Sequence, residues 1–487
     1  MRFGTGSQGI ALTILCLGTV LTFLVRLIWT GPYLILGDDT GSYLSSLNFI
    51  QGTDLTGHGG IRPPLVGYFL YPFVEILGVF PGAKVAALVA SVIGAGAFFL
   101  VAKRLTQPLW AAIGSVAFIW LPIYAETLGW GFLSILVIAL ALISMWAWLR
   151  YADSPGLDRA LTAGAIMAVM AYLNQTAVPV VAVVFGVFLL YLVIRDPGTH
   201  LKYLLPAGSL VLVLGLGSIP YSLAHFTNET VLATHGEFAH FSIKIKDPIT
   251  AGIAIIGSAL FIYTGRKIGG AAGAFIMIGG VITSVTQSIT VPSSLGLITV
   301  LGRTILWTWM FVFLALVWAT PRVLNNLFER LSTSQRQVFA GSAATLVLLF
   351  LSVSWTLRLE SVMPFYTTLT PDSVTALEWI HNNTGPEEKI GVYPLTLAFY
   401  TNGIANRPTI TTAPVDGGTG EMAYEEAIRG WWARDDQAVR CSLGYLDNCA
   451  TYLPDLGARY LLTRAEADLP LAYQVGQMKI YDLVGQP

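Results

Sequence analysis

Two adjacent carboxylates, Asp38 and Asp39, stand in the stretch GDDTGSYL, directly after the first long apolar run of the chain. Charge near hydrocarbon is disfavoured, so a carboxylate pair at the exit of an apolar segment indicates a use for it. One aspartate can act as a general base while the other orients a substrate or a cation. A structural role is also open, because an aspartate often caps a helix, here one beginning near Thr40.

The polar loop after this pair contains three further candidates for binding, Tyr43, His58 and Arg62. Arg62 is the only cation of the loop and precedes two prolines. Its guanidinium can pair with an aspartate or hold a phosphate, or it can anchor the chain at the membrane interface with its stem along apolar surface. His58 lies between glycines and could bind a sugar or a metal, although a lone loop histidine usually does neither.

Two later charged residues, Glu126 and Arg303, also stand beside apolar runs. Glu126, in PIYAETLGWG, stands beside Trp130 and could supply another carboxylate next to an aromatic platform for a sugar; an ordinary interfacial pair is the alternative. Arg303, in VLGRTILWTWMF, opens a late apolar run. An arginine at such a position needs an anion, which can be a lipid phosphate, a carboxylate or a lipid headgroup.

The elements that must position these residues are apolar. The 487 residues are 54% hydrophobic and 11% charged, where soluble domains carry about 25% charged residues, so we expect a polytopic membrane protein. The net charge of -1 and the lack of a basic tract argue against nucleic-acid binding. Eleven apolar segments predict about 11 transmembrane helices: 10–34, 82–102, 109–124, 128–149, 160–173, 179–194, 203–221, 249–263, 270–286, 298–319 and 338–355.

The basic residues predict the orientation of these segments. Twelve lysines and arginines fall in connections on the side of the N-terminus and five on the other side, so the positive-inside rule places the N-terminus in the cytoplasm. The first run then reads as a retained signal anchor. Residues 65–80 are short and contain Pro72 and Glu75, so we expect a helix lying along the interface inside a first outer loop of about residues 35–81.

The composition changes near residue 356, which predicts a transmembrane domain over 1–355 and an extracytoplasmic domain over 356–487. TPDSVTALEWIHNNTG predicts a helix that Thr370 or Asp372 starts and Gly385-Pro386 ends. KIGVYP, ARYLLTR and KIYDLV predict strands, and together with the helix they indicate a small α/β domain. Cys441 and Cys449 are spaced for a disulfide outside the cytoplasm, with two free thiols as the alternative.

The order of these features resembles the GT-C superfamily of integral-membrane glycosyltransferases. Within it, the chain is similar to the family-39-like group, which includes protein O-mannosyltransferases and the aminoarabinose transferases that modify lipid A. In that group an outer loop with paired acidic residues, a nearby tyrosine and an amphipathic helix follow the first span. The matching segments are GDDTGSYL, RPPLVGYFLYPF, GRTILW, ALEWIHNNTGPEEKIGVYP, NRPTI and GARYLLT.

The resemblance implies transfer of a sugar from a polyprenyl-phosphate donor to a hydroxyl on the non-cytoplasmic face of a membrane, such as the plasma membrane. An aspartate would be the base of an inverting displacement, and Arg303 with Arg62 would stabilise the leaving phosphate. Counted back from the tyrosine, Asp39 stands at the catalytic position and Thr40 replaces an acidic residue. Asp38-Asp39 can also be the pair itself, shifted by one.

Beside the two arginines, we expect Tyr43, His58 and Glu126 to bind substrate; the nearby tyrosine belongs to the resemblance, whereas His58 and Glu126 are candidates from their own residue types and positions. The resemblance leaves the cofactor open, because some members use a divalent cation and others none; magnesium or manganese would be held by Asp38, Asp39 and Glu126. The acceptor is a lipid, a glycan or a protein, and membrane lipids surround the bundle.

Three other functions remain for comparison. A secondary transporter predicts ionisable residues near mid-span and broken helices related by a repeat, and the sequence has its acids at span ends and no repeat. A non-catalytic scaffold predicts an outer domain that binds a partner by itself. Within enzymes, the alternative is an oligosaccharyl- or arabinofuranosyl-type transferase of the same architecture.

Overall fold

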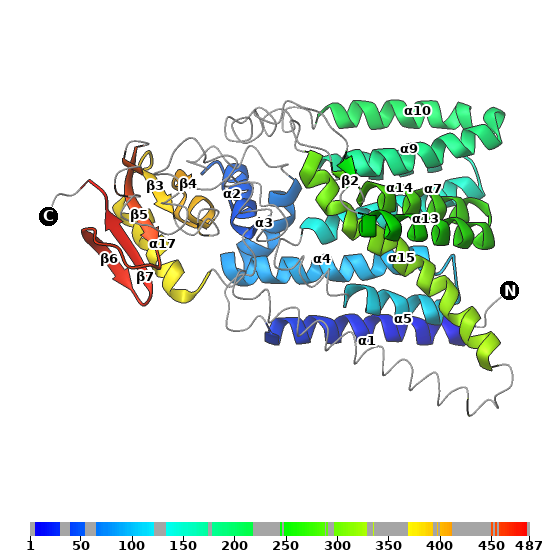
Figure 1. Ribbon diagram of the computed structural model, residues 1–487, viewed down its shortest axis with the longest axis horizontal. Coiled ribbons are helices and arrows are strands. Elements are labelled where there is room, and N and C mark those ends of the chain that lie inside the picture. Colours follow the sequence, from blue (N-terminus) through cyan, green and yellow to red (C-terminus); the bar gives the residue numbers. More distant parts are fainter. Residues whose placement is uncertain are drawn as a thin grey trace.

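A helical bundle and a small sheet domain lie end to end along the long axis of the molecule, with helices α2 and α3 between them (Figure 1). This arrangement comes from a computed structural model of the full chain. The residues that it describes are 5–29, 39–53, 65–120, 133–173, 178–217, 244–245, 248–287, 289–290, 297–328, 335, 369–392, 397, 400–411, 450, 453–454 and 457–484.

Ten of the eleven apolar segments form helices, and the eleventh, 338–355, lies outside the described residues. Among the described residues, five helices are long and apolar enough to cross a membrane and five more are apolar but shorter, so the fold class is confirmed and the number of spans stays a prediction. The bundle helices are α1 (Thr5–Trp29), α4 (Val79–Ala102), α5 (Pro108–Ile119), α7 (Leu133–Asp153), α8 (Leu157–Val169, continued by η2, Met170–Tyr172), α9 (Val178–Arg195), α10 (Pro197–Leu216), α13 (Pro248–Ile268), α14 (Gly270–Gln287) and α15 (Leu297–Phe328).

Glycines bring several of these helices into close contact. A Cβ on Gly114 of α5 would lie 2.3 Å from Val317 of α15, and one on Gly18 of α1 would lie 2.4 Å from Val116 of α5. Lipid tails are as apolar as leucine, so helices in a bilayer gain little from burying apolar side chains and associate through close packing of small residues. The apolar faces that remain exposed on α10 and α13 suit contact with lipid.

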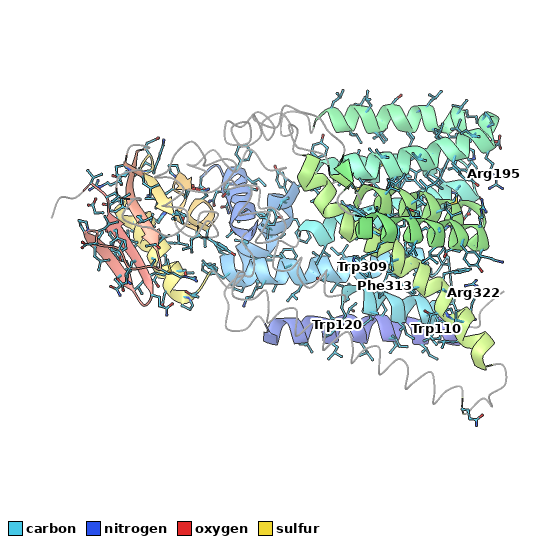
Figure 2. The ribbon with its side chains drawn as sticks, viewed as in Figure 1. Trp110, Trp120, Arg195, Trp309, Phe313 and Arg322 are labelled. Atoms are coloured by element: carbon cyan, nitrogen blue, oxygen red, sulfur yellow. The ribbon has the colours of Figure 1, made fainter. Side chains whose placement is uncertain are left out.

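Basic residues occupy the helix ends farthest from the sheet domain, as Arg195 and Arg322 show (Figure 2). Four of these helices end with an aromatic residue followed four positions later by a cation that lies over the ring. The pairs are Phe99–Lys103, Trp146–Arg150, Tyr263–Lys267 and Trp318–Arg322, with 4.4–5.7 Å between cation and ring centroid. These are residues that the sequence assigns to the cytoplasmic side.

Helices α2 (Asp39–Ile50) and α3 (Leu65–Leu77) pack against each other at the other end of the bundle. A Cβ on Gly67 would lie 2.4 Å from Ile50 and 2.9 Å from the carbonyl oxygen of Ser46, so only glycine permits this approach. One stripe of α3 is buried, while Tyr68 and Ile76 remain 60% and 79% exposed. The predicted helix over 65–80 is therefore present as far as Leu77; Gly78, with a left-handed φ of +83°, separates it from α4, which includes residues 79–80. The exposed apolar face of α3 suits a membrane interface.

The C-terminal domain contains a five-stranded sheet in the order β4-β3-β5-β7-β6. The parallel strands β4, β3 and β5 adjoin the antiparallel strands β7 and β6. Three strands coincide with the predicted segments, and two, β4 and β6, were not predicted. The strands are β3 (Lys389–Val392), β4 (Thr409–Thr411), β5 (Ala458–Thr463), β6 (Leu471–Val475) and β7 (Met478–Asp482); a separate two-stranded ladder joins β1 (Lys244–Ile245) and β2 (Ile289–Thr290).

Helix α17 (Pro371–Asn383) packs on this sheet and confirms the predicted helix. Thr370 is the N-cap, its hydroxyl accepting a hydrogen bond from the amide of Ser373 at 3.3 Å, and Pro371 opens the first turn. Of the two predicted starting residues, Thr370 is therefore the cap. Cys441 and Cys449 lie outside the described residues.

A buried arginine connects α17 to the π-helical turn η3 (Thr401–Ala405). Arg407 is 5% exposed, and its guanidinium donates to the carbonyl oxygens of His381 (2.7 Å) and Thr384 (2.8 Å) at the end of α17. It also donates to the hydroxyl of Thr384 and to the carbonyls of Ala405 and Asn406. Burial lowers the pKa of Arg407 from its usual value. Since the hydrogen-bond acceptors are carbonyl and hydroxyl oxygens, the positive charge of the Arg407 guanidinium is stabilised by their dipoles.

Candidate functional site

Helix α2 carries the first predicted site residues. It begins at Asp39 and ends before Gly52, whose φ of +70° is left-handed and stops the helix. Asp38 lies outside the described residues, as do His58, Arg62 and Glu126, while Asp39 and Arg303 are described by their backbone alone. Whether these side chains meet in one cavity therefore stays a prediction.

Asp39 is the first described residue of α2. The roles of Asp38 and Asp39, and the choice between them as a base, therefore stay predictions.

Tyr43 stands one helical turn after Asp39, on the same face of α2. It is 1% exposed and lies among the buried side chains of Leu44 and Leu47. The predicted role of Tyr43 in substrate binding is an open prediction, and the described structure gives it a fixed place beside the start of the helix.

Helix α15 carries Arg303 in its second turn, and Trp307 follows one turn later. Trp307 lines an apolar pocket between α7, α9, α14 and α15, and Arg303 stands one turn closer to the start of α15. The other side chains that line it include Met145, Phe185, Phe275, Thr283 and Phe311. The free volume between these side chains is about 10 Å³, room for one water-sized molecule at most, so they form a closely packed apolar cluster.

The described residues contain no group of three histidines, cysteines or acids that could hold a metal ion. The carboxylates proposed as ligands, those of Asp38, Asp39 and Glu126, belong to positions whose side chains the structure does not describe. Carboxylate oxygens are ligands that magnesium and manganese prefer. The metal therefore stays a proposal, and no reaction step is assigned to it.

The sheet domain reaches α2 through two asparagine side chains. Asn48 of α2 donates from Nδ2 to the carbonyl of Gly403 in η3 at 3.0 Å, and Asn406 donates from Nδ2 to the carbonyl of Thr53 at 2.5 Å. Neither role was predicted from the sequence. The usable signal was the stretch NGIANRP, because asparagine is enriched at left-handed positions and Asn406 has a φ of +53°.

Comparison with known proteins gives matches among solved structures. ArnT from Cupriavidus metallidurans bound to undecaprenyl phosphate has a TM-score of 0.58 at 14% identity, over 98% of this chain and 98% of ArnT. The apo oligosaccharyltransferase of Archaeoglobus fulgidus has a TM-score of 0.59 at 10% identity, over 93% of this chain and 69% of that one. The mycobacterial arabinofuranosyltransferase AftD has a TM-score of 0.53 at 15% identity, over 97% and 41%.

No protein-family model and no curated protein matches the chain in sequence. The structural similarities nevertheless extend over almost the whole chain, and they confirm the predicted fold: a bundle of apolar helices followed by a small C-terminal domain with a mixed sheet. Another structure of the archaeal enzyme contains zinc and sulfate.

Proposed function

We propose that the chain is a membrane glycosyltransferase that moves a sugar from a polyprenyl-phosphate donor to an acceptor hydroxyl of a lipid, a glycan or a protein. The observation that carries the proposal is the match over 98% of both chains to ArnT with undecaprenyl phosphate bound. The match includes the sheet domain as well as the bundle. The acidic pair in the first outer loop and the arginine near the start of α15 supply the groups that this chemistry needs.

In the proposed reaction, Asp39 takes the proton from the acceptor hydroxyl and the oxygen attacks the anomeric carbon. The bond from that carbon to the phosphate oxygen breaks on the opposite side, so the configuration inverts and polyprenyl phosphate leaves. Arg303 and Arg62 stabilise the charge that develops on the phosphate. Asp38 orients the acceptor, or exchanges roles with Asp39.

The remaining residues receive supporting roles. Tyr43, His58 and Glu126 bind the sugar. A divalent cation, if one takes part, is held by Asp38, Asp39 and Glu126. The lipid tail of the donor explains why the reaction belongs in a membrane, since the tail reaches the site from within the bilayer.

The orientation belongs to the proposal as well. The basic helix ends lie in the cytoplasm, and α2, α3 and the sheet domain lie on the outer face of the plasma membrane. A membrane-impermeant thiol reagent applied to intact cells tests this with variants lacking native cysteines. Gln474→Cys on the exposed strand β6 should be labelled and Lys202→Cys at the start of α10 should not; the reverse pattern would contradict the orientation.

The catalytic assignment is tested in membranes supplied with polyprenyl-phosphate sugars. Asp39→Asn should lower the turnover about 1,000-fold, as expected for loss of a general base. Asp153→Asn is the matched control, because Asp153 is an exposed aspartate paired with Arg104 at the far end of the bundle, and it should stay within about twofold of wild type. Full activity in both Asp38→Asn and Asp39→Asn would refute the assignment.

A second candidate within the same class is oligosaccharyl transfer, which the TM-score of 0.59 with the archaeal oligosaccharyltransferase favours. This chain covers 69% of that enzyme, so about a third of that enzyme lies outside the match. The acceptor distinguishes them: incorporation of a single labelled sugar into lipid or glycan supports the first candidate, and transfer of a preassembled glycan to a peptide asparagine supports the second.

A further inference from the structure

A short network of hydrogen bonds joins helix α2 to the sheet domain. Asn48 donates to the carbonyl of Gly403, while its own carbonyl accepts from the amide of Thr53 at 2.9 Å. The carbonyl of Thr53 in turn accepts from Asn406. Two elements separated by about 350 residues in the sequence are thus joined at the C-terminal end of α2.

On the side of the sheet domain, further hydrogen bonds fix the segment that contains Asn406. Asn406 directly follows η3 and takes a left-handed conformation, and its neighbour Arg407 fixes the end of α17. The Nδ1 atom of His381 in α17 lies 3.0 Å from the carbonyl oxygen of Ala405 in η3. Single turns of π-helix occur often at functional sites. The described contacts lead from α17 through η3 to α2 and so to Asp39.

We propose that the sheet domain positions the start of α2, and with it Asp39, and that Asn48 and Asn406 are the positioning residues. This rests on the proposed function, because it assigns Asp39 to catalysis. Neither asparagine contacts substrate in this proposal. Both act by setting the tilt of α2, whose opposite end carries Asp39.

Because α2 is long, a small tilt about its Asn48 end displaces Asp39 appreciably. Nine residues separate Asp39 from Asn48, which is about 13.5 Å along a helix axis. A tilt of about 10° about the Asn48 end would therefore displace the first turn by roughly 2 Å. A misplacement of about 1 Å can cost roughly 100-fold in rate. Loss of the two asparagine contacts should lower turnover at least 10-fold while leaving lipid binding unchanged.

The test uses the full chain in lipid nanodiscs with two variants designed to keep their backbone. Asn48→Ala removes one donor and favours the helix, and Asn406→Gly removes the other while glycine accepts the left-handed conformation. Asn383→Ala is the matched control, because Asn383 is an exposed residue of the same domain whose amide donates within α17 to the carbonyl of Trp379.

Hydrogen exchange and turnover are measured for each variant. Hydrogen exchange across residues 39–50 should be at least 10-fold faster in both variants and unchanged in the control, with residues 371–383 unaffected by Asn48→Ala. Turnover should fall at least 10-fold with the donor KM and the affinity for undecaprenyl phosphate within twofold. Unchanged exchange across 39–50, or wild-type turnover despite faster exchange, would overturn the proposal. A wild-type chain without transfer activity refutes the proposed function, and with it the positioning of Asp39 for catalysis, whatever the exchange shows.

Discussion

The helical bundle and the sheet domain satisfy their polar groups in different ways. In the bundle, many serine and threonine hydroxyls bond within their own helix: Ser115 donates to the carbonyl of Ala111 at 2.6 Å and Thr283 to that of Gly279 at 2.8 Å. Polar bonds between bundle helices are isolated pairs, such as Tyr151 of α7 with His200 of α10 at 2.9 Å. In the sheet domain, by contrast, Arg407 joins α17 and η3 through five hydrogen bonds. The bundle therefore relies mainly on close packing and the domain on a polar network between elements, which predicts different sensitivities to substitution.

The largest effect on stability is expected at the polar centre of the domain. Arg407→Lys replaces a planar fork by a single ammonium and leaves carbonyls at the end of α17 without a donor, which should cost about 3 kcal/mol. Hydrogen exchange of α17 and β3 in the full chain measures this. Arg459→Lys is the control, since Arg459 is exposed and its pair with Glu388 at 2.8 Å should contribute less than about 1 kcal/mol. An equal loss of stability in Arg407→Lys and Arg459→Lys would contradict the greater contribution assigned to Arg407.

A second effect tests whether shape holds the bundle. A Cβ on Gly82 would lie 2.6 Å from the backbone oxygen of Phe73, so Gly82→Ala should force α3 and α4 apart at a cost of about 2 kcal/mol. Gly96→Ala on the same helix meets nothing within 4 Å and should stabilise by up to about 1 kcal/mol. Thermal unfolding in detergent micelles should show a lower midpoint for Gly82→Ala and a higher midpoint for Gly96→Ala. A lower midpoint for both variants would contradict the role of close packing at Gly82.

The smallest effect is expected for a hydroxyl of the bundle. Thr283→Val removes a bond within α14 and keeps the shape of the side chain, so it should cost roughly 0.6 kcal/mol. Thr384→Val, in the domain, removes both the acceptor of Arg407 and a donor to Ile380 and should cost about 2 kcal/mol. Hydrogen exchange of α14 and α17 compares the two variants. A similar loss in both would mean that the bundle and the domain use their hydroxyls alike.

The same difference explains what could be predicted from the sequence. Helices such as α9 and α13 follow from local apolar runs, because hydrophobicity and length decide them. Strand β4 has three residues and β6 is an exposed edge, so neither shows a clear alternating pattern. The burial of Arg407 depends on elements distant in sequence, and no local pattern indicates it.

The candidate site was predictable to the same extent. The acidic pair, Tyr43 and Arg303 were proposed as site residues because charged or polar residues beside apolar runs are conspicuous, and their roles stay predictions. Helix α2 is described from Asp39, close to Thr40, where the structural alternative placed a helix. Asn48 and Asn406 were not predicted, because an asparagine in a polar loop looks ordinary until its partner is known. Tertiary contacts between distant segments are the missing information.

The aromatic and cationic pairs at the helix ends set a limit on the membrane that the protein can occupy. Helix α4 has 24 residues and is about 36 Å long, and its pair of Phe99 and Lys103 has the composition of an interfacial anchor. A typical hydrocarbon core is about 30 Å thick, and a longer span is accommodated by tilting or by thicker lipid. On the proposed function, transfer in vesicles of increasing acyl-chain length should be fastest where the core thickness matches α4.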